Sequence, residues 1–193
     1  MSTTENKINY GLKKVYYAKI TEESETGTEY ATPVAIPGAV NASLKKNYER
    51  TAIAADDDPE YAVAVDNKGY DGDFEFTNLP QSFYTDCLGF EVDGSTIKES
   101  ADGKPCPFAL LFEMDGDQQK RRHAFYRCMA TPPDLDTATK GDRMEAKTTK
   151  ISISATPAKD TRIIKRTTIT EDGQVYSKWF ETVQTSGGTV VGS

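Results

Sequence analysis

The chain has 193 residues, of which 27% are charged and 37% hydrophobic, and its formal net charge is −7. This length is enough for one domain that buries a core without disulfides or metal ions. The acidic balance repels phosphate backbones and therefore disfavours a high-affinity nucleic-acid binder. The three cysteines are widely separated, so we expect free thiols and synthesis in a reducing cytoplasm.

The ends of the chain are polar. The first residues, MSTTENKINYG, lack the apolar stretch of a secretory signal, and no segment approaches the ~20 apolar residues that span a bilayer. We therefore expect no membrane partner. Residues 1–193 are expected to form a single domain with a flexible N-terminal arm (about 1–9) and a flexible C-terminal tail (about 185–193).

Short apolar runs separated by turn signals predict a mainly β protein. Residues 13–21, KKVYYAKIT, carry apolar side chains on both faces, so we expect other elements to pack on each side. The prolines and glycine of residues 32–44 predict either a bent strand or two short strands joined by a kink. Residues 49–66 predict strands that flank an acidic turn at residues 56–59.

The clearest alternation lies in residues 69–77, GYDGDFEFT. Because side chains alternate between the faces of a strand, this pattern predicts a strand with one aromatic and one acidic face. The aromatic face holds Tyr70, Phe74 and Phe76, and the acidic face holds Asp71, Asp73 and Glu75.

One helix is expected in residues 78–89, NLPQSFYTDCLG. Asn78 is a candidate N-cap, Pro80 suits the first turn, and Gly89 supplies a C-terminal stop. The helix should have about two to three turns and must dock on a sheet to persist. Its apolar stripe holds Phe83, Tyr84, Cys87 and Leu88.

The second half of the chain predicts further strands. Residues 108–114 and 123–129 should form a hairpin around a turn at residues 115–119. Residues 147–157 alternate between apolar and polar side chains, and residues 160–170 predict one more strand.

The motifs that suggest a catalytic or metal site have a simpler explanation. Three aspartate groups, at residues 56–58, 71–73 and 115–117, lack the spacing of a calcium-binding loop and are expected to be solvated turns or strand edges. The single histidine, His123, has no nucleophile in a known context and alternates with Phe125, which indicates a packed residue. We therefore expect no catalytic residue, metal or cofactor, although a hydrolase that uses paired acids stays open.

Lys120, Arg121 and Arg122 form the densest basic run in the chain. Such a run can face DNA, or it can solubilise the end of a hairpin. It can also pair with acids on a neighbouring subunit.

Several segments, in this order, resemble the major tail protein family of long-tailed, non-contractile bacteriophages. They are IPGAV (36–40), GYDG (69–72), the pattern LP…F…D.LG (79–89) and FALLFE (108–113), and the likeness extends from Gly11 to Val183. The late pattern of Tyr176, Trp179, Phe180 and Val183 agrees with them. The resemblance implies a two-sheet β-sandwich or barrel of the phage tail-tube type with one short helix.

The resemblance also implies a function. Members of the family form hexameric rings that stack into the tail tube of the virion, through which DNA passes without specific binding. The partners would be further copies, the tape-measure protein, and the tail terminator and distal tail proteins. The main alternative is a free β-sandwich module that binds a ligand such as a carbohydrate.

Three groups of residues are candidates for assembly on this basis. The segment from Asn47 to Glu60 resembles a long hairpin loop that extends toward the adjacent ring, and its candidates are Asn47, Glu49, Arg50, Asp56, Asp57 and Asp58. The acidic face of Asp71, Asp73 and Glu75 is a candidate for the lumen wall, with plain solvation on the outer surface as the alternative. The run of Lys120, Arg121 and Arg122 is a candidate for contacts with acids of a neighbouring subunit.

Overall fold

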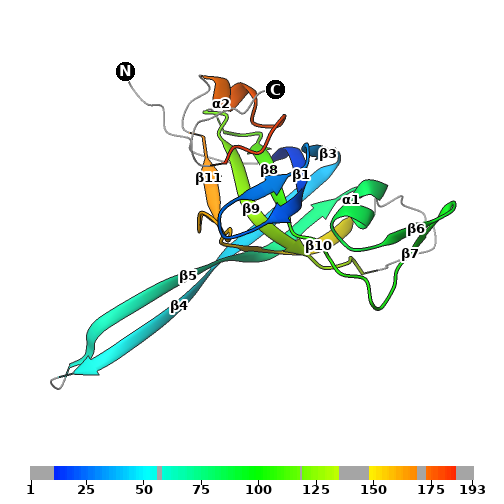
Figure 1. Ribbon diagram of the computed structural model, residues 1–193. Coiled ribbons are helices and arrows are strands. Elements are labelled where there is room, and N and C mark those ends of the chain that lie inside the picture. Colours follow the sequence, from blue (N-terminus) through cyan, green and yellow to red (C-terminus); the bar gives the residue numbers. More distant parts are fainter. Residues whose placement is uncertain (1–10, 56–57, 118, 135–147, 169–172, 186–193) are drawn as a thin grey trace, which may run out of the picture.

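The computed structural model describes residues 11–55, 58–117, 119–134, 148–168 and 173–185 (Figure 1). These residues are mainly β, with two sheets and two short helices. The expected N-terminal arm and most of the expected C-terminal tail lie outside the described residues. Neither described helix reaches the length or the apolar character that a bilayer-spanning helix needs.

The larger sheet has nine strands and is antiparallel throughout. Its path is β2-β1-β8-β9-β10-β5-β4, with β3 paired to β1 and β11 paired to β9, and the smaller sheet is the β6–β7 hairpin. The strands are β1 (Leu12–Glu23), β2 (Thr28–Tyr30), β3 (Val34–Ile36), β4 (Ala39–Ala55), β5 (Asp58–Phe76), β6 (Glu91–Asp93), β7 (Thr96–Lys98), β8 (Phe108–Met114), β9 (Arg122–Ala130), β10 (Thr149–Thr156) and β11 (Lys165–Thr167).

The nine-stranded sheet curls so that its two halves enclose one core. The strands β5 and β8 are three steps apart in the sheet, which would separate them by about 14 Å if the sheet were flat. Yet the ring centroids of Phe74 on β5 and Phe112 on β8 are 5.9 Å apart, and those of Tyr70 and Phe125 are 5.2 Å apart. The curled sheet fits the expected sandwich.

Strand β1 is packed on both sides, as its sequence predicts. Val15 and Tyr17 belong to the main core, whereas Ala18 lies in a second cluster beneath Trp179, which is 1% exposed. Tyr16, on the same side as Ala18, stacks on Phe180 with centroids 4.8 Å apart. The segment around Trp179 therefore covers the face of β1, β8 and β9 that points away from the main core.

The predicted kink between residues 32 and 44 is confirmed as the break between β3 and β4, but β4 is not a short strand and continues to Ala55. Gly38 has φ +79°, a conformation that side chains with a Cβ rarely adopt. A Cβ at this position would lie 2.0 Å from Thr77 Oγ1, so the close approach also requires glycine.

The predicted helix is confirmed, but it begins later and is shorter than expected. Helix α1 (Gln81–Asp86) has six residues and Pro80 at its N-cap, so Asn78 is not the cap. The reason is that a proline pushes the preceding residue, Leu79, into an extended conformation and prevents the helix from starting earlier. Phe83 is buried against Tyr17, and Gly89 has φ +78° just past the helix.

Two elements were not predicted. The β6–β7 hairpin has three-residue strands, and helix α2 (Gln174–Ser177) has four residues, so the expected count of one helix is wrong. Elements of this length are too short for a periodic signal. The strand expected at residues 160–170 is confirmed only over the three residues of β11, because the chain turns first at Arg162, with φ +59°.

Candidate assembly surfaces

The strands β4 and β5 continue far beyond the body of the protein (Figure 1). We call their outer part, residues 47–55 and 58–69, the arm. Within the body β5 also pairs with β10, from Tyr70 to Phe76, but along the arm β4 and β5 pair only with each other. The side chains from Lys45 to Ile53 and from Tyr61 to Lys68 are all exposed.

The two faces of the arm differ. The register places Arg50 opposite Val65 and Ala52 opposite Val63, so these side chains share one face, which we call the bulky face. Its large side chains are strongly exposed: Tyr61 62%, Val65 62%, Tyr48 52% and Val63 42%. The opposite face holds Glu49, Thr51, Ile53, Ala62, Ala64 and Asp66. These side chains are small or charged, apart from Ile53, which is large and apolar.

An ionic cluster lies at the base of the arm on this opposite face. Lys68 Nζ lies 3.2 Å from Glu49 Oε2 and also pairs with Asp66. The hydrogen bond from Lys68 holds the pKa of the Asp66 carboxyl below its usual range. Because these ion pairs are exposed to solvent, they add little to stability. We infer that they help to fix the pairing register of β4 and β5.

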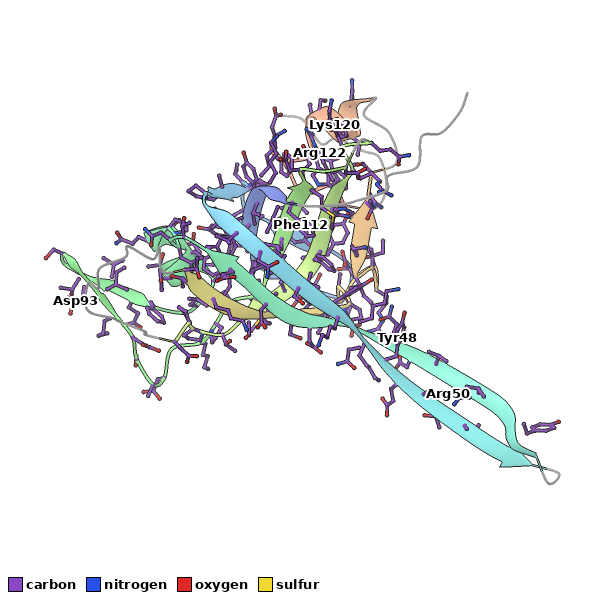
Figure 2. All side chains as sticks on the ribbon, turned by 180° about the vertical axis from the view of Figure 1, so that it is seen from behind. Tyr48, Arg50, Asp93, Phe112, Lys120 and Arg122 are labelled. Atoms are coloured by element: carbon purple, nitrogen blue, oxygen red, sulfur yellow. The ribbon has the colours of Figure 1, made fainter. Side chains whose placement is uncertain are left out.

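The described residues among those predicted to lie in an inter-ring loop lie on the arm. Asn47, Glu49 and Arg50 are on β4, with Tyr48 and Arg50 labelled in Figure 2, and Asp58 is the first residue of β5. Asp56 and Asp57 lie outside the described residues. Asn47 Nδ2 donates to Asp71 Oδ2 at 2.8 Å, within one chain. Contact with another ring stays a prediction.

The predicted acidic face of β5 lies on the outside of the curled sheet, away from the core. Asp73 accepts from Ser152 Oγ at 2.7 Å and pairs with Lys150 Nζ at 2.9 Å, and both interactions lower its pKa. Glu75 accepts from Thr148.

Neighbouring strands add hydroxyls and two lysines to this face, so it is not wholly acidic as the single strand suggested. We call the whole surface the polar strip: Ser43, Lys45, Asp71, Asp73, Glu75, Lys150, Ser152 and Ser154.

The basic run lies at the end of the body remote from the arm (Figure 2). Arg121 Nε pairs with Asp117 Oδ2 at 2.6 Å, and Arg122 Nε pairs with Glu113 Oε2 at 3.1 Å. These intrachain partners occupy two of the three side chains that we expected to meet a neighbouring subunit. Contact of the basic run with a neighbouring subunit stays a prediction.

Arg122 also holds the C-terminal segment against the sheet. Its guanidinium lies 3.7 Å from the ring centroid of Tyr176 and 4.8 Å from that of Phe180, and it donates to the Tyr176 carbonyl. Trp179 Nε1 donates to the His123 carbonyl at 3.4 Å. These contacts were not predicted, because nothing in the basic run indicates a stacking partner more than fifty residues away.

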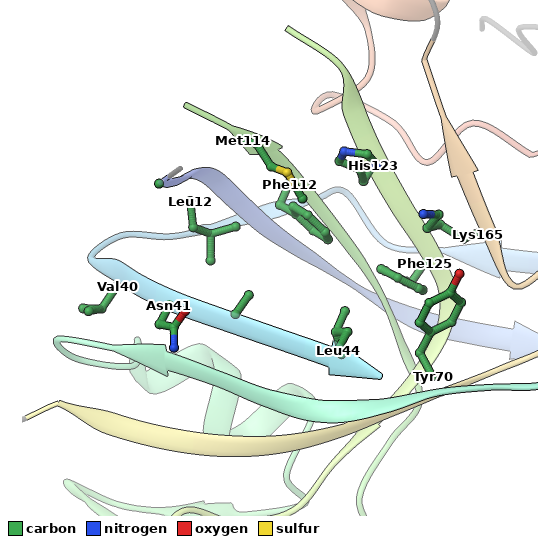
Figure 3. Close-up of a pocket in the computed structure, with 12 residues that line it drawn as sticks. Leu12, Val40, Asn41, Leu44, Tyr70, Phe112, Met114, His123, Phe125 and Lys165 are labelled. Carbon is green, nitrogen blue, oxygen red and sulfur yellow. The ribbon is translucent and has the colours of Figure 1, made fainter. Parts of the chain in front are cut away.

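A cavity of about 490 Å³ opens between the two halves of the sheet, and we call it the groove (Figure 3). Its walls come from β1, β4, β5, β8, β9 and β11, which sequence reasoning could not bring together. His123 and Lys165 lie at one side of the groove (Figure 3). The other principal side chains are apolar or aromatic: Leu12, Val40, Leu44, Tyr70, Phe112 and Phe125.

His123 is a packed residue, as its alternation with Phe125 predicts. Its ring centroid is 5.2 Å from that of Phe112, and its Nδ1 lies 2.9 Å from Thr167 Oγ1. Burial, with a further contribution from the Lys165 charge, lowers the pKa of His123 to about 4. The imidazole is therefore neutral at pH 7.

Two lysines stand at the end of the groove nearest the arm. Lys165 Nζ lies 5.7 Å from the ring centroid of Tyr70, and Lys46 is paired directly opposite Tyr70 across β4 and β5. Partial burial and repulsion from Lys46 lower the pKa of Lys165. We call Lys46 and Lys165 the basic mouth of the groove.

Within the described residues, no three His, Cys, Asp or Glu side chains are grouped so that they could hold a metal ion. A scan of the chain against protein-family models found no matching family, and a search of curated proteins found no significant match. The likeness to phage major tail proteins stays a prediction from the sequence segments described above.

Proposed function

We propose that this protein is the repeating subunit of a phage tail tube, in which hexameric rings stack into a conduit for the genome. The subunit has no catalytic role. Its partners would be further copies, the tape-measure protein, and the tail terminator and distal tail proteins. The arm is the observation that carries the proposal, together with the sequence resemblance.

The arm is difficult to explain in a protein that works alone. A two-stranded ribbon is marginally stable in water without a further layer against it. On this ribbon Tyr48, Tyr61, Val63 and Val65 are between 42% and 62% exposed. Burying such side chains between copies would contribute about 1.5–3 kcal/mol for each one that becomes fully covered. An assembly supplies the missing layer.

The polar strip supports the same proposal. A channel for DNA must let the duplex slide, so its wall should present carboxylates and hydroxyls and avoid a strongly basic surface. The strip holds the carboxylates of Asp71, Asp73 and Glu75 among serine hydroxyls, with two lysines. We propose that this strip faces the lumen.

Electron microscopy and sedimentation of the purified protein over a range of concentrations test the proposal. The wild type should form rings or tubes of uniform diameter. Val63→Lys with Val65→Lys should abolish them, because charges would replace the bulky face, while circular dichroism shows an unchanged fold. Thr51→Lys with Ala64→Lys is the matched control on the opposite face and should still assemble. Equal loss of assembly in both double variants would contradict the role of the bulky face.

The second candidate function is a free β-sandwich module that binds a small ligand. The groove favours it, because about 490 Å³ falls within the range of small-molecule pockets. Such a module would sediment as a monomer at every concentration, and the Val63→Lys, Val65→Lys variant would sediment as the wild type does.

A further inference from the structure

Among the described residues, the groove and its basic mouth lie open on the surface of a single chain. The groove presents the aromatic rings of Tyr70, Phe112 and Phe125. Among the ion pairs of the described residues, none includes Lys46 or Lys165. An occupant that fits would therefore combine apolar side chains with negative charge.

The outer end of the arm has this combination. The residues between Ala55 and Tyr61 in the sequence include four acids and no base: Asp56, Asp57, Asp58 and Glu60. Tyr61 and Val63 follow directly, and both are exposed on the bulky face. Along the arm, acidic residues come first and large apolar side chains follow. Along the groove, the basic mouth comes first and the aromatic walls follow, so the two orders match.

The arm of the same chain cannot fill its own groove. Leu44 lines the groove, and Val63 pairs with Ala52, eight residues further along the same strand. At ~3.3 Å per residue, Val63 therefore lies about 26 Å away from the groove. The arm points away from the body (Figure 1), so an arm that enters the groove belongs to another copy.

We propose that the groove receives the outer end of the arm of a second copy, with Tyr61 and Val63 against its walls and the adjacent acidic charge at Lys46 and Lys165. This inference rests on the proposed function and identifies which surface takes the arm. Opposite charges orient the encounter, and aromatic pairs add to the burial of apolar area. Because the two surfaces are unlike, each bound copy leaves a free arm and a free groove, so the contact repeats from copy to copy and either closes a ring or extends a filament.

The proposal also sets the direction of the bound arm. With the acidic end at the basic mouth, Tyr61 and then Val63 run along the groove toward Val40 at its other end (Figure 3). Lys46 of the basic mouth and Val40 are six residues apart on β4, about 20 Å, and Val63 lies five residues beyond Asp58 on β5, about 16 Å, so the segment from the acidic end to Val63 is long enough to extend along the groove. Val63 of one copy should therefore lie beside Val40 of the next.

Disulfide trapping tests this pairing. In a Cys106→Ser background, which removes the thiol that is not buried, a Val63→Cys protein is mixed with a Val40→Cys protein and oxidised. The mixture should give several-fold more covalent dimer than Val40→Cys mixed with Ala64→Cys, which places the thiol on the opposite face of the arm. Adding Lys46→Glu and Lys165→Glu to the Val40→Cys protein should slow trapping, and high salt should slow it too.

The outcomes separate the two proposals. Tubes in the microscope without excess dimer from Val63→Cys would overturn the groove as the receptor and leave the tail-tube proposal standing. Excess dimer without tubes would support the docking and count against the tube. Neither tubes nor dimer would overturn both.

Discussion

His123 shows how the groove controls the charge of one side chain. Phe112 and Thr167 enclose its ring, and the positive charges of Lys165 and Arg121 oppose protonation, whereas Asp117 favours it. Burial is the largest of these effects, and it places the pKa of the folded state at about 4, below the ordinary 6.5. His123, the residue that first suggests catalysis, is therefore a neutral part of the groove wall at pH 7.

A pH dependence of stability follows. Between pH 6.5 and about 4 the unfolded chain binds a proton at His123 that the folded chain does not bind, so stability falls as the pH falls through this window. Urea unfolding at pH 7 and pH 4.5 should show a smaller acid loss for His123→Gln than for the wild type. The difference between the two proteins isolates the histidine from the carboxylates that titrate nearby. Identical acid losses would contradict the buried, neutral imidazole.

Arg122 is the second residue whose chemistry can be tested. Lysine at this position keeps the charge beside Glu113 but lacks the planar group that stacks between Tyr176 and Phe180. We expect Arg122→Lys to lower the free energy of unfolding by about 1–2 kcal/mol. Arg121→Lys is the control and should cost less, because the Arg121 side chain is more exposed than that of Arg122. Chemical denaturation measures the free energy of unfolding of both variants. Equal losses of stability would contradict a contribution from the stacking of Arg122 on the two rings.

At the scale of elements, β4 and β5 depend on a close approach at Gly72. A Cβ there would lie 1.8 Å from the Ser43 carbonyl oxygen of the paired strand, and backbone cannot yield as a side chain can. Gly72→Ala should therefore destabilise the fold by about 1–3 kcal/mol, measured by chemical denaturation. Gly27→Ala is the control, because no atom lies within 4 Å of its added Cβ. A Gly72→Ala protein as stable as the control would contradict the tight pairing.

The elements that could be predicted from the sequence are those whose side chains alternate against a core. Residues 69–77 and 147–157 show this, since Phe74 and Ile151 are buried while Asp71 and Ser152 are exposed. The arm could be predicted as strands but not as an exposed ribbon. Apolar residues such as Val63 and Val65 normally indicate a buried strand, whereas here a single chain leaves their side chains exposed to solvent.

The candidate sites divide in a similar way. The arm residues Asn47 and Glu49 were placed by resemblance, and the structure brings them onto one hairpin. The groove could not be predicted, because Leu12, Tyr70 and Phe125 meet only once the sheet curls. The partners of Arg122 were out of reach for the same reason, since Tyr176 and Phe180 are distant in the sequence.

At the scale of the whole molecule, the polar strip tests where the lumen lies. Asp71→Lys with Glu75→Lys makes the strip basic while it leaves the Asp73–Lys150 pair in place. Tubes should still form, because both side chains point away from the core, but they should now retain DNA at low salt. Co-sedimentation of DNA with the tubes measures this.

The control for this experiment has the same change in net charge. Glu25→Lys with Glu29→Lys alters two exposed acids near β2, away from the strip, and takes the formal charge of −7 to −3 in the same way, since each substitution adds two units. If both tubes retain equal amounts of DNA, net charge and not position explains the effect. The strip would then be an outer surface.

The continuity of β5 from the arm into the body has a mechanical consequence. A pull on the arm along its length is carried by β5 to its pairing with β10, where seven residue pairs run side by side. The hydrogen bonds of this ladder lie perpendicular to the strands, so the pull loads them in shear, all at once, instead of peeling them one by one. If copies join through the arm, each joint is fastened to its body by a tether suited to tension, and a filament built this way can bend or be stretched before a subunit unravels.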